Sequence, residues 1–222
     1  MADTILVTGS RSPLGTALAD LYLSGGHTVI STYPAGEESP QPGKEVEDNF
    51  IPVSWNRRSP LSGHGVLLEA LNRSRRIDEA VVTFEPRNES RPLHEIPTAD
   101  TDWYFDTYLK GSIFLIKELL AQFEKQRAGR LSIAVQTAET GMLAPFDACV
   151  AGGLRSFAGS LFSLYQNEPI VINGFESLSS DGEGFARFIY RARRDRSDSQ
   201  HGKWHRFGEK SVWNALGLSP RK

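Results

Sequence analysis

Residues 8–15, TGSRSPLG, form a glycine-containing turn between a short apolar run and a helix-like stretch. Backbone amides in such a turn, together with the N-terminus of the following helix, bind phosphate groups. Gly9 and Gly15 are the small residues that the turn needs, and Arg11 supplies a positive charge. Pro13 starts a helix readily but has no N–H to donate. The turn therefore has two interpretations, a weakened phosphate site and a tight strand-to-helix connection without a ligand.

Other reactive side chains occur later in the chain, but no spacing among them specifies an active site. An acid, a base or a nucleophile could come from Tyr108, Thr137, Glu139, Asp147 or Cys149. Cys149 is expected to be a small buried hydrophobic residue rather than a catalytic thiol. His201 and His205 lie four residues apart, and without a third ligand at a suitable spacing no metal site is predicted.

Length, charge and cysteine content narrow the class of protein. The chain has 222 residues, 39% of them apolar, which suits one domain with a sizeable core. Its formal net charge of −2 gives no general attraction to nucleic acid or to a membrane surface, so neither is expected as a partner. The single cysteine excludes an internal disulfide and favours a reducing compartment. No apolar run approaches the roughly 20 residues that cross a bilayer, so we expect a cytoplasmic protein.

Short runs rich in β-branched residues alternate with longer helical patterns along the chain. The runs cover 4–9, 27–33, 49–55, 80–84, 131–136 and 170–175, and the helical patterns lie near 14–24, 61–74, 99–124 and 149–166. This alternation predicts an α/β fold, a doubly wound Rossmann-like parallel sheet of six or seven strands with helices on both faces. We expect one domain over residues 1–222.

Two segments do not fit the alternation. Residues 34–49 contain five acids and three prolines against one lysine, which predicts a mobile surface loop. Residues 183–210 contain eight Lys or Arg against four acids. These charges could form an anion-binding or partner-binding face, but a solvated helix end followed by a loop is the favoured interpretation. Residues 195–222 are therefore predicted to be irregular.

Several motifs together resemble the short-chain dehydrogenase/reductase family over nearly the whole chain. They are the turn at 8–15, DTYLKGSIF at 106–114, GRLSIAV at 129–135 and FDACVAGGLRSFAGSL at 146–161, in the order and at the spacing of that family. The resemblance implies a Rossmann-like fold, a nicotinamide dinucleotide as cofactor, hydride transfer as the chemistry, and oligomers formed through the fourth and fifth helices.

The cofactor positions implied by the resemblance depart from the family pattern. Tyr33 stands where an acid would select NAD, or a basic residue NADP. Glu85 places a carboxylate where the family has the glycine of Asn-Asn-Ala-Gly, close under the cofactor. Arg11 could pair with a 2′-phosphate, although the acidic loop opposes this and a solvated surface charge is an equal alternative. We expect no NAD(P) binding or weak binding, with any contacts made by Gly9, Arg11, Gly15 and Tyr33.

All four catalytic roles that the family resemblance implies are unfilled. Tyr108 replaces the asparagine, Gln136 the serine, Phe146 the tyrosine and Val150 the lysine. Phenylalanine has no ionisable hydroxyl and valine has no charge, so neither proton transfer nor its tuning is possible at these positions. We therefore predict no catalytic residues and no activity of the protein alone.

The helices near 99–124 and 149–166 carry more apolar residues than one core-facing stripe requires. Residues 103–123 have 13 apolar or aromatic positions in 21. This excess predicts a hetero-oligomer with an active short-chain dehydrogenase, or a homo-oligomer, through the two helices. The expected function is that of a non-catalytic subunit with a structural or regulatory role. The alternatives are an active NAD(P)-dependent oxidoreductase with a rearranged site and a dinucleotide-binding sensor.

Overall fold

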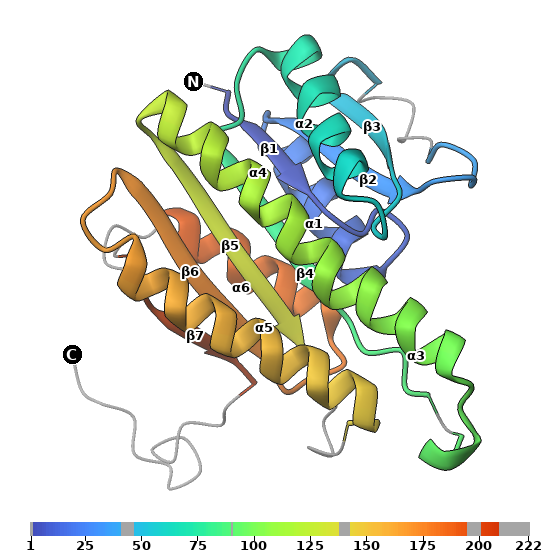
Figure 1. Cartoon of the computed structure of the whole chain (residues 1–222). Helices are drawn as coiled ribbons and strands as arrows, with labels where there is room; N and C mark the ends of the chain where they lie inside the picture. The colour runs from blue at the N-terminus through green and yellow to red at the C-terminus, as the bar shows by residue number, and fades with distance from the viewer. Residues whose placement is uncertain (1, 41–46, 90, 138–142, 195–200, 209–222) are drawn as a thin grey trace, which may run out of the picture.

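Seven parallel strands form one sheet, in the order β3-β2-β1-β4-β5-β6-β7, in the computed structural model of the chain (Figure 1). The structure describes residues 2–40, 47–89, 91–137, 143–194 and 201–208. The strands are β1 (Thr4–Val7), β2 (Thr28–Pro34), β3 (Phe50–Trp55), β4 (Glu79–Phe84), β5 (Gly129–Gln136), β6 (Ile170–Ser177) and β7 (Trp204–Phe207). The predicted α/β fold with a doubly wound Rossmann-like sheet is confirmed.

Six strands correspond to the six predicted runs, and β7 was not predicted. The expectation of an irregular segment at 195–222 is wrong for residues 204–207, which pair with β6 in parallel. Four residues are too few to show a strand period in the sequence. The strand is held by its neighbour, because Gly174 of β6 has no side chain and the ring of Trp204 lies directly against it.

Helices cover both faces of the sheet. They are α1 (Pro13–Ser24), α2 (Pro60–Ser74), α3 (Thr98–Phe105), α4 (Gly111–Gln126), α5 (Pro145–Leu164) and α6 (Gly182–Arg194). Helices α1 and α6 pack on one face, and α2, α4 and α5 pack on the other (Figure 1). Strand side chains alternate between these two cores: Ile5 and Val7 point to the α1 side and Leu6 to the α4 side. No helix in these ranges is long and apolar enough to cross a bilayer.

The sequence Arg-Ser-Pro-Leu starts both α1 and α2, at residues 11–14 and 58–61. In each helix the serine hydroxyl accepts a hydrogen bond from the amide three residues later, Gly15 in α1 (3.1 Å) and Ser62 in α2 (3.4 Å). The proline fills the first helical position, where its missing N–H costs nothing. Pro13 therefore acts as a helix start, as the sequence predicted.

The helical region differs from the prediction in three places. The segment near 99–124 is divided into α3, a π-helical turn (Asp106–Lys110) and α4. Helix α5 begins at Pro145, earlier than predicted, and α6 was not among the predicted helices although its buried residues recur at helical spacing. The loop predicted to be mobile at 34–49 lies outside the described residues between 41 and 46.

Candidate functional site

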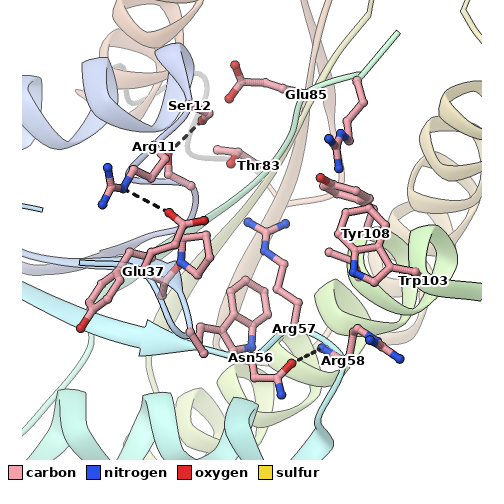
Figure 2. Close-up of a pocket in the computed structure, with 18 residues that line it drawn as sticks. Arg11, Ser12, Glu37, Asn56, Arg57, Arg58, Thr83, Glu85, Trp103 and Tyr108 are labelled. Atoms are coloured by element: carbon pink, nitrogen blue, oxygen red, sulfur yellow. Dashed lines mark hydrogen bonds and ion pairs between the residues drawn. The ribbon is translucent and has the colours of Figure 1, made fainter. Parts of the chain in front are cut away.

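A cavity lined by both polar and apolar residues lies at the carboxyl ends of β1 to β4. Strands β2 and β3 extend the sheet from β1 in one direction, and β4 to β7 extend it in the other. The order in which strands are added to the sheet therefore changes direction between β1 and β4. Ligands of open α/β sheets bind at such a reversal. The cavity has a volume of about 540 Å³ and is walled by the β1–α1 turn, the ends of β2, β3 and β4, and the π-helical turn (Figure 2).

The predicted turn glycines are both required by local packing. Gly9 has a φ of +81°, in the region that favours glycine. A Cβ atom on Gly15 would collide with the carbonyl of Gly9, because the helix starts directly against the strand end. These two glycines therefore explain the tight turn whether or not a phosphate binds there.

The first amides of α1 all have acceptors within the protein. Position 13 is proline and has no N–H. The amide of Leu14 donates to the Glu85 carboxylate (3.4 Å), and the amide of Gly15 donates to the hydroxyl of Ser12 (3.1 Å). The next amide, that of Thr16, donates to the carbonyl of Ser12 (2.9 Å). The helix N-terminus that would face a phosphate is thus satisfied by the protein itself.

Glu85 comes from the end of β4 and reaches across to the start of α1. Figure 2 shows its carboxylate on the same side of the cavity as Ser12 and beyond Thr83. Burial raises the pKa of Glu85, and the hydrogen bonds from Ser12 and Leu14 and the charge of Arg57 oppose this without reversing it. Its Oε1 atom is buried and has no hydrogen-bond partner among the described residues. Glu85 therefore places a negative charge, or a neutral acid at lower pH, where the resemblance implies a cofactor phosphate.

The guanidinium of Arg11 is already engaged by groups of the protein. Its guanidinium lies 3.5 Å from the Glu37 carboxylate and donates to the carbonyl of Glu38 (2.6 Å), both in the loop after β2. Figure 2 shows the Arg11 and Glu37 pair at one side of the cavity. Tyr33 is half-buried in the cavity wall at the end of β2. The structure therefore brings Gly9, Arg11 and Tyr33 together at one cavity, with the charge of Arg11 already paired.

The sequence analysis missed Arg57, which follows β3. Its guanidinium lies over the buried ring of Trp55 (4.6 Å from the ring centre) and faces Tyr108 (5.9 Å). Figure 2 shows this side chain extending into the middle of the cavity. No carboxylate of the described residues lies within ion-pair distance of it. The only signal in the sequence is an arginine just after a predicted strand, which is too common to single out.

Three of the four positions implied to be catalytic belong to the packed interior rather than to a reactive centre. Phe146 is 9% exposed, with its ring 5.6 Å from that of Tyr104 and 5.5 Å from that of Phe105. Val150 is fully buried one helical turn later. The side-chain amide of Gln136 donates to the backbone carbonyl of Ser179 (2.9 Å). These three side chains are engaged in packing or in structural hydrogen bonds.

Tyr108 is the fourth of these positions and lies in the π-helical turn, where its ring lines the cavity. A π-helical turn adds one residue to a helix and is often found at functional sites. Its carbonyl accepts a hydrogen bond from the hydroxyl of Ser112 (2.8 Å). Of the four positions, Tyr108 is therefore the one whose side chain faces the cavity.

Asp147, a candidate acid or base, has a structural role. It is completely buried and accepts hydrogen bonds from the amides of Arg87 (3.0 Å) and Asn88 (2.9 Å). The hydroxyl of Tyr104 also donates to it, and burial together with this carboxylate raises the pKa of Tyr104. Asp147 thus fixes the loop after β4 to α5.

The remaining candidates do not gather at the cavity. The hydroxyl of Thr137 donates to the carbonyl of Ser177 (2.9 Å), and Glu139 lies outside the described residues. Cys149 is exposed, so its prediction as a buried residue is wrong; the residue lies on the outer face of α5. The ring of His201 bonds to the carbonyl of Phe162, and His205 stacks on Phe175. No cluster of three metal-ligating side chains occurs in the described part of the chain.

Comparison with known proteins supports the fold. No protein-family model matches the chain, and no curated protein sequence matches it either. A solved structure from Bacillus thuringiensis, provisionally named a 3-oxoacyl-reductase, superposes with a TM-score of 0.77. The alignment covers 96% of this chain and 99% of that chain at 18% sequence identity. At this identity the likeness shows a shared fold, that of an α/β Rossmann-like protein.

Proposed function

We propose that this chain is a non-catalytic member of the short-chain dehydrogenase/reductase family with a structural or regulatory role. The proposal rests on the start of α1, where Glu85 and Ser12 accept the amides of Leu14 and Gly15. A cofactor pyrophosphate would have to displace the Glu85 carboxylate, and Pro13 offers no amide in exchange. The family assignment is supported by the motif order and by the similarity in fold to the reductase-named structure.

The two positions at which the family resemblance implies a catalytic tyrosine and lysine support the same proposal. Hydride transfer in this family needs an ionisable hydroxyl and a cation one helical turn later, and here both positions are apolar and buried. The ring of Phe146 packs against the rings of Tyr104 and Phe105 at that point, so no ionisable hydroxyl is present at position 146. The protein alone should therefore turn over neither NADH nor NADPH.

The proposed role includes pairing through α4 and α5 with an active relative. Part of the apolar excess of residues 103–123 is covered within the chain, because Trp103, Phe105, Tyr108 and Leu109 pack against the core. Phe114 is half-buried outside both core clusters, and Leu164 at the end of α5 is 73% exposed. A second subunit packed on these helices would cover apolar side chains of this kind. A complete relative is favoured as the partner because an intact interface beside an empty site is useful when the neighbour carries out the chemistry.

Two measurements test the proposal. Calorimetric titration with NAD⁺, NADH, NADP⁺ and NADPH should give dissociation constants above roughly 1 mM, which corresponds to less than about 4 kcal/mol of binding free energy. Micromolar binding of any one would instead favour a sensor or a rearranged enzyme. Purification from the native source should recover a second short-chain dehydrogenase that keeps the tyrosine and lysine. Recovery of a monomer with steady turnover of a carbonyl compound would contradict the proposal.

A further inference from the structure

The start of α1, where a phosphate would bind, is occupied by Glu85, but Arg57 remains as a fixed cation in the cavity. Its lining contains four arginines and two glutamates. Glu37 is paired with Arg11, and Glu85 is hydrogen-bonded to the start of α1. The other three arginines form no ion pair among the described residues; Arg58 and Arg87 are exposed, whereas Arg57 is half-buried. A guanidinium does not lose its charge in a protein, so this position favours an anion.

Arg57 is held in place by its surroundings. Its guanidinium carbon lies over the ring of Trp55, 4.6 Å from the ring centre, and Trp55 is 2% exposed. Its backbone packs against the first residue of α4, where a Cβ on Gly111 would lie 2.5 Å from the Arg57 carbonyl oxygen. A side chain that is already ordered loses less conformational entropy when a ligand binds. The fork of the guanidinium is therefore pre-positioned toward the middle of the cavity (Figure 2).

The walls beside Arg57 are aromatic. Trp103 and Tyr108 stand next to each other with ring centres 5.9 Å apart, across the cavity from Arg11 (Figure 2). Flat aromatic side chains favour ligands with a planar ring. Two buried hydroxyls in the lining, those of Thr32 and Thr107, have no hydrogen-bond partner in the described part of the chain. These two oxygen atoms are buried beneath the cavity surface, so they make the wall more polar but do not face the ligand space.

We propose that the cavity binds a planar aromatic anion, whose carboxylate or phosphate pairs with Arg57 and whose ring lies against Tyr108 and Trp103. A volume of about 540 Å³ falls within the range of small-molecule sites. The ligand is smaller than a dinucleotide, because Glu85 closes the end at which a pyrophosphate would bind. The inference goes beyond the proposed function, because the bound anion would be the effector of a regulatory subunit.

Three probes of one shape test the site by calorimetry: 2-naphthoate, 2-naphthyl phosphate and the uncharged 2-naphthamide. At least one anion should bind with a stoichiometry of one, at least about tenfold more tightly than the amide, because the guanidinium forms charge-assisted hydrogen bonds. Whichever anion binds more tightly identifies the ligand as a carboxylate or a phosphate monoester. Failure of both anions to bind, or equal binding of the amide, would overturn the proposal.

Variants of neighbouring arginines assign the effect to one side chain. Arg57→Gln should weaken anion binding at least about tenfold, and Arg57→Lys, which keeps the charge without the planar fork, should fall between it and the parent protein. Arg58→Gln is the matched control, since Arg58 is the exposed neighbour in the same turn. An equal loss in Arg58→Gln, which also lines the cavity, would show that the anion does not pair specifically with Arg57 and would contradict the proposal. Circular dichroism checks folding, and Arg57→Lys carries the test if Arg57→Gln does not fold.

The outcomes separate this inference from the proposed function. If the anions do not bind, this inference fails, but the proposal that the protein neither binds nor turns over a nicotinamide cofactor is unaffected. Tight binding of NADH, with retention of naphthoate binding through Arg57, would instead contradict the non-catalytic proposal while keeping the anion site.

Discussion

The carboxylate of Glu85, at the end of β4, accepts a hydrogen bond from the amide of Leu14, in the first turn of α1 (3.4 Å). This contact joins the ends of β1 and β4, between which the order of the strands in the sheet changes direction. A carboxylate near a helix N-terminus is favoured by the partial positive charge there. The protein therefore supplies from its own chain the negative group that the fold otherwise takes from a ligand.

Removal of the Glu85 side chain should make the start of α1 partly available to a phosphate group. Glu85→Gly frees the amide of Leu14 and removes a negative charge, so dinucleotide affinity should rise by roughly tenfold or more, in line with a hydrogen bond to a charged group. Calorimetric titration measures the change. Glu69→Gln is the control, because it removes a carboxylate that pairs with Arg73 on α2, away from the start of α1 and outside the cavity lining. An unchanged affinity in Glu85→Gly would show that Glu85 is not what excludes the cofactor.

The pKa of Glu85 also predicts a dependence of stability on pH. Burial raises its pKa in the folded protein, so the folded state binds more protons than the unfolded state once the pH exceeds the ordinary glutamate value of about 4.3. The contribution of Glu85 to the free energy of unfolding is therefore full below that pH and falls as the pH rises. Glutamine does not titrate, so the free energy of unfolding of Glu85→Gln does not fall with pH for this reason. The stability of the variant relative to the parent should increase between pH 4 and pH 7 in urea unfolding, and a constant difference would contradict the raised pKa.

The sequence predicted the fold well because its signals are local. Pro13 after a capping serine marks the start of α1, and alternating apolar runs mark six strands. The contacts of the site could not be predicted, because they join distant residues. Glu85 was recognised as a misplaced carboxylate, but its bond to Leu14 spans 71 positions, and the bond from Tyr104 to Asp147 spans 43. The exposed Cys149 shows the same limit, since exposure depends on which face of α5 meets the sheet.

Restoring two catalytic side chains should not restore catalysis. In Phe146→Tyr with Val150→Lys, the new lysine would replace a fully buried valine, and the new hydroxyl would enter a cluster of aromatic rings. An unpaired buried charge is strongly destabilising, by several kcal/mol. The variant should show a lower melting temperature and no oxidation of NADH or NADPH above background with a panel of carbonyl compounds. Phe146→Tyr alone serves as the folded control, and a measurable turnover by either variant would show an intact cofactor site.

Phe114 provides the test of assembly. It lies on α4, half-buried and outside both core clusters, and its backbone borders Gly63 of α2. If α4 and α5 carry the interface, Phe114→Glu buries a charge without a partner and should dissociate the oligomer, weakening association by at least a few kcal/mol. Leu61→Glu is the matched control, since it makes the same kind of change at a residue of α2 that is 83% exposed. Sedimentation velocity should show a smaller species for Phe114→Glu alone, with lower activity of any catalytic partner. A parent protein that sediments as a monomer, with no partner in its native source, would remove the basis for pairing through these helices.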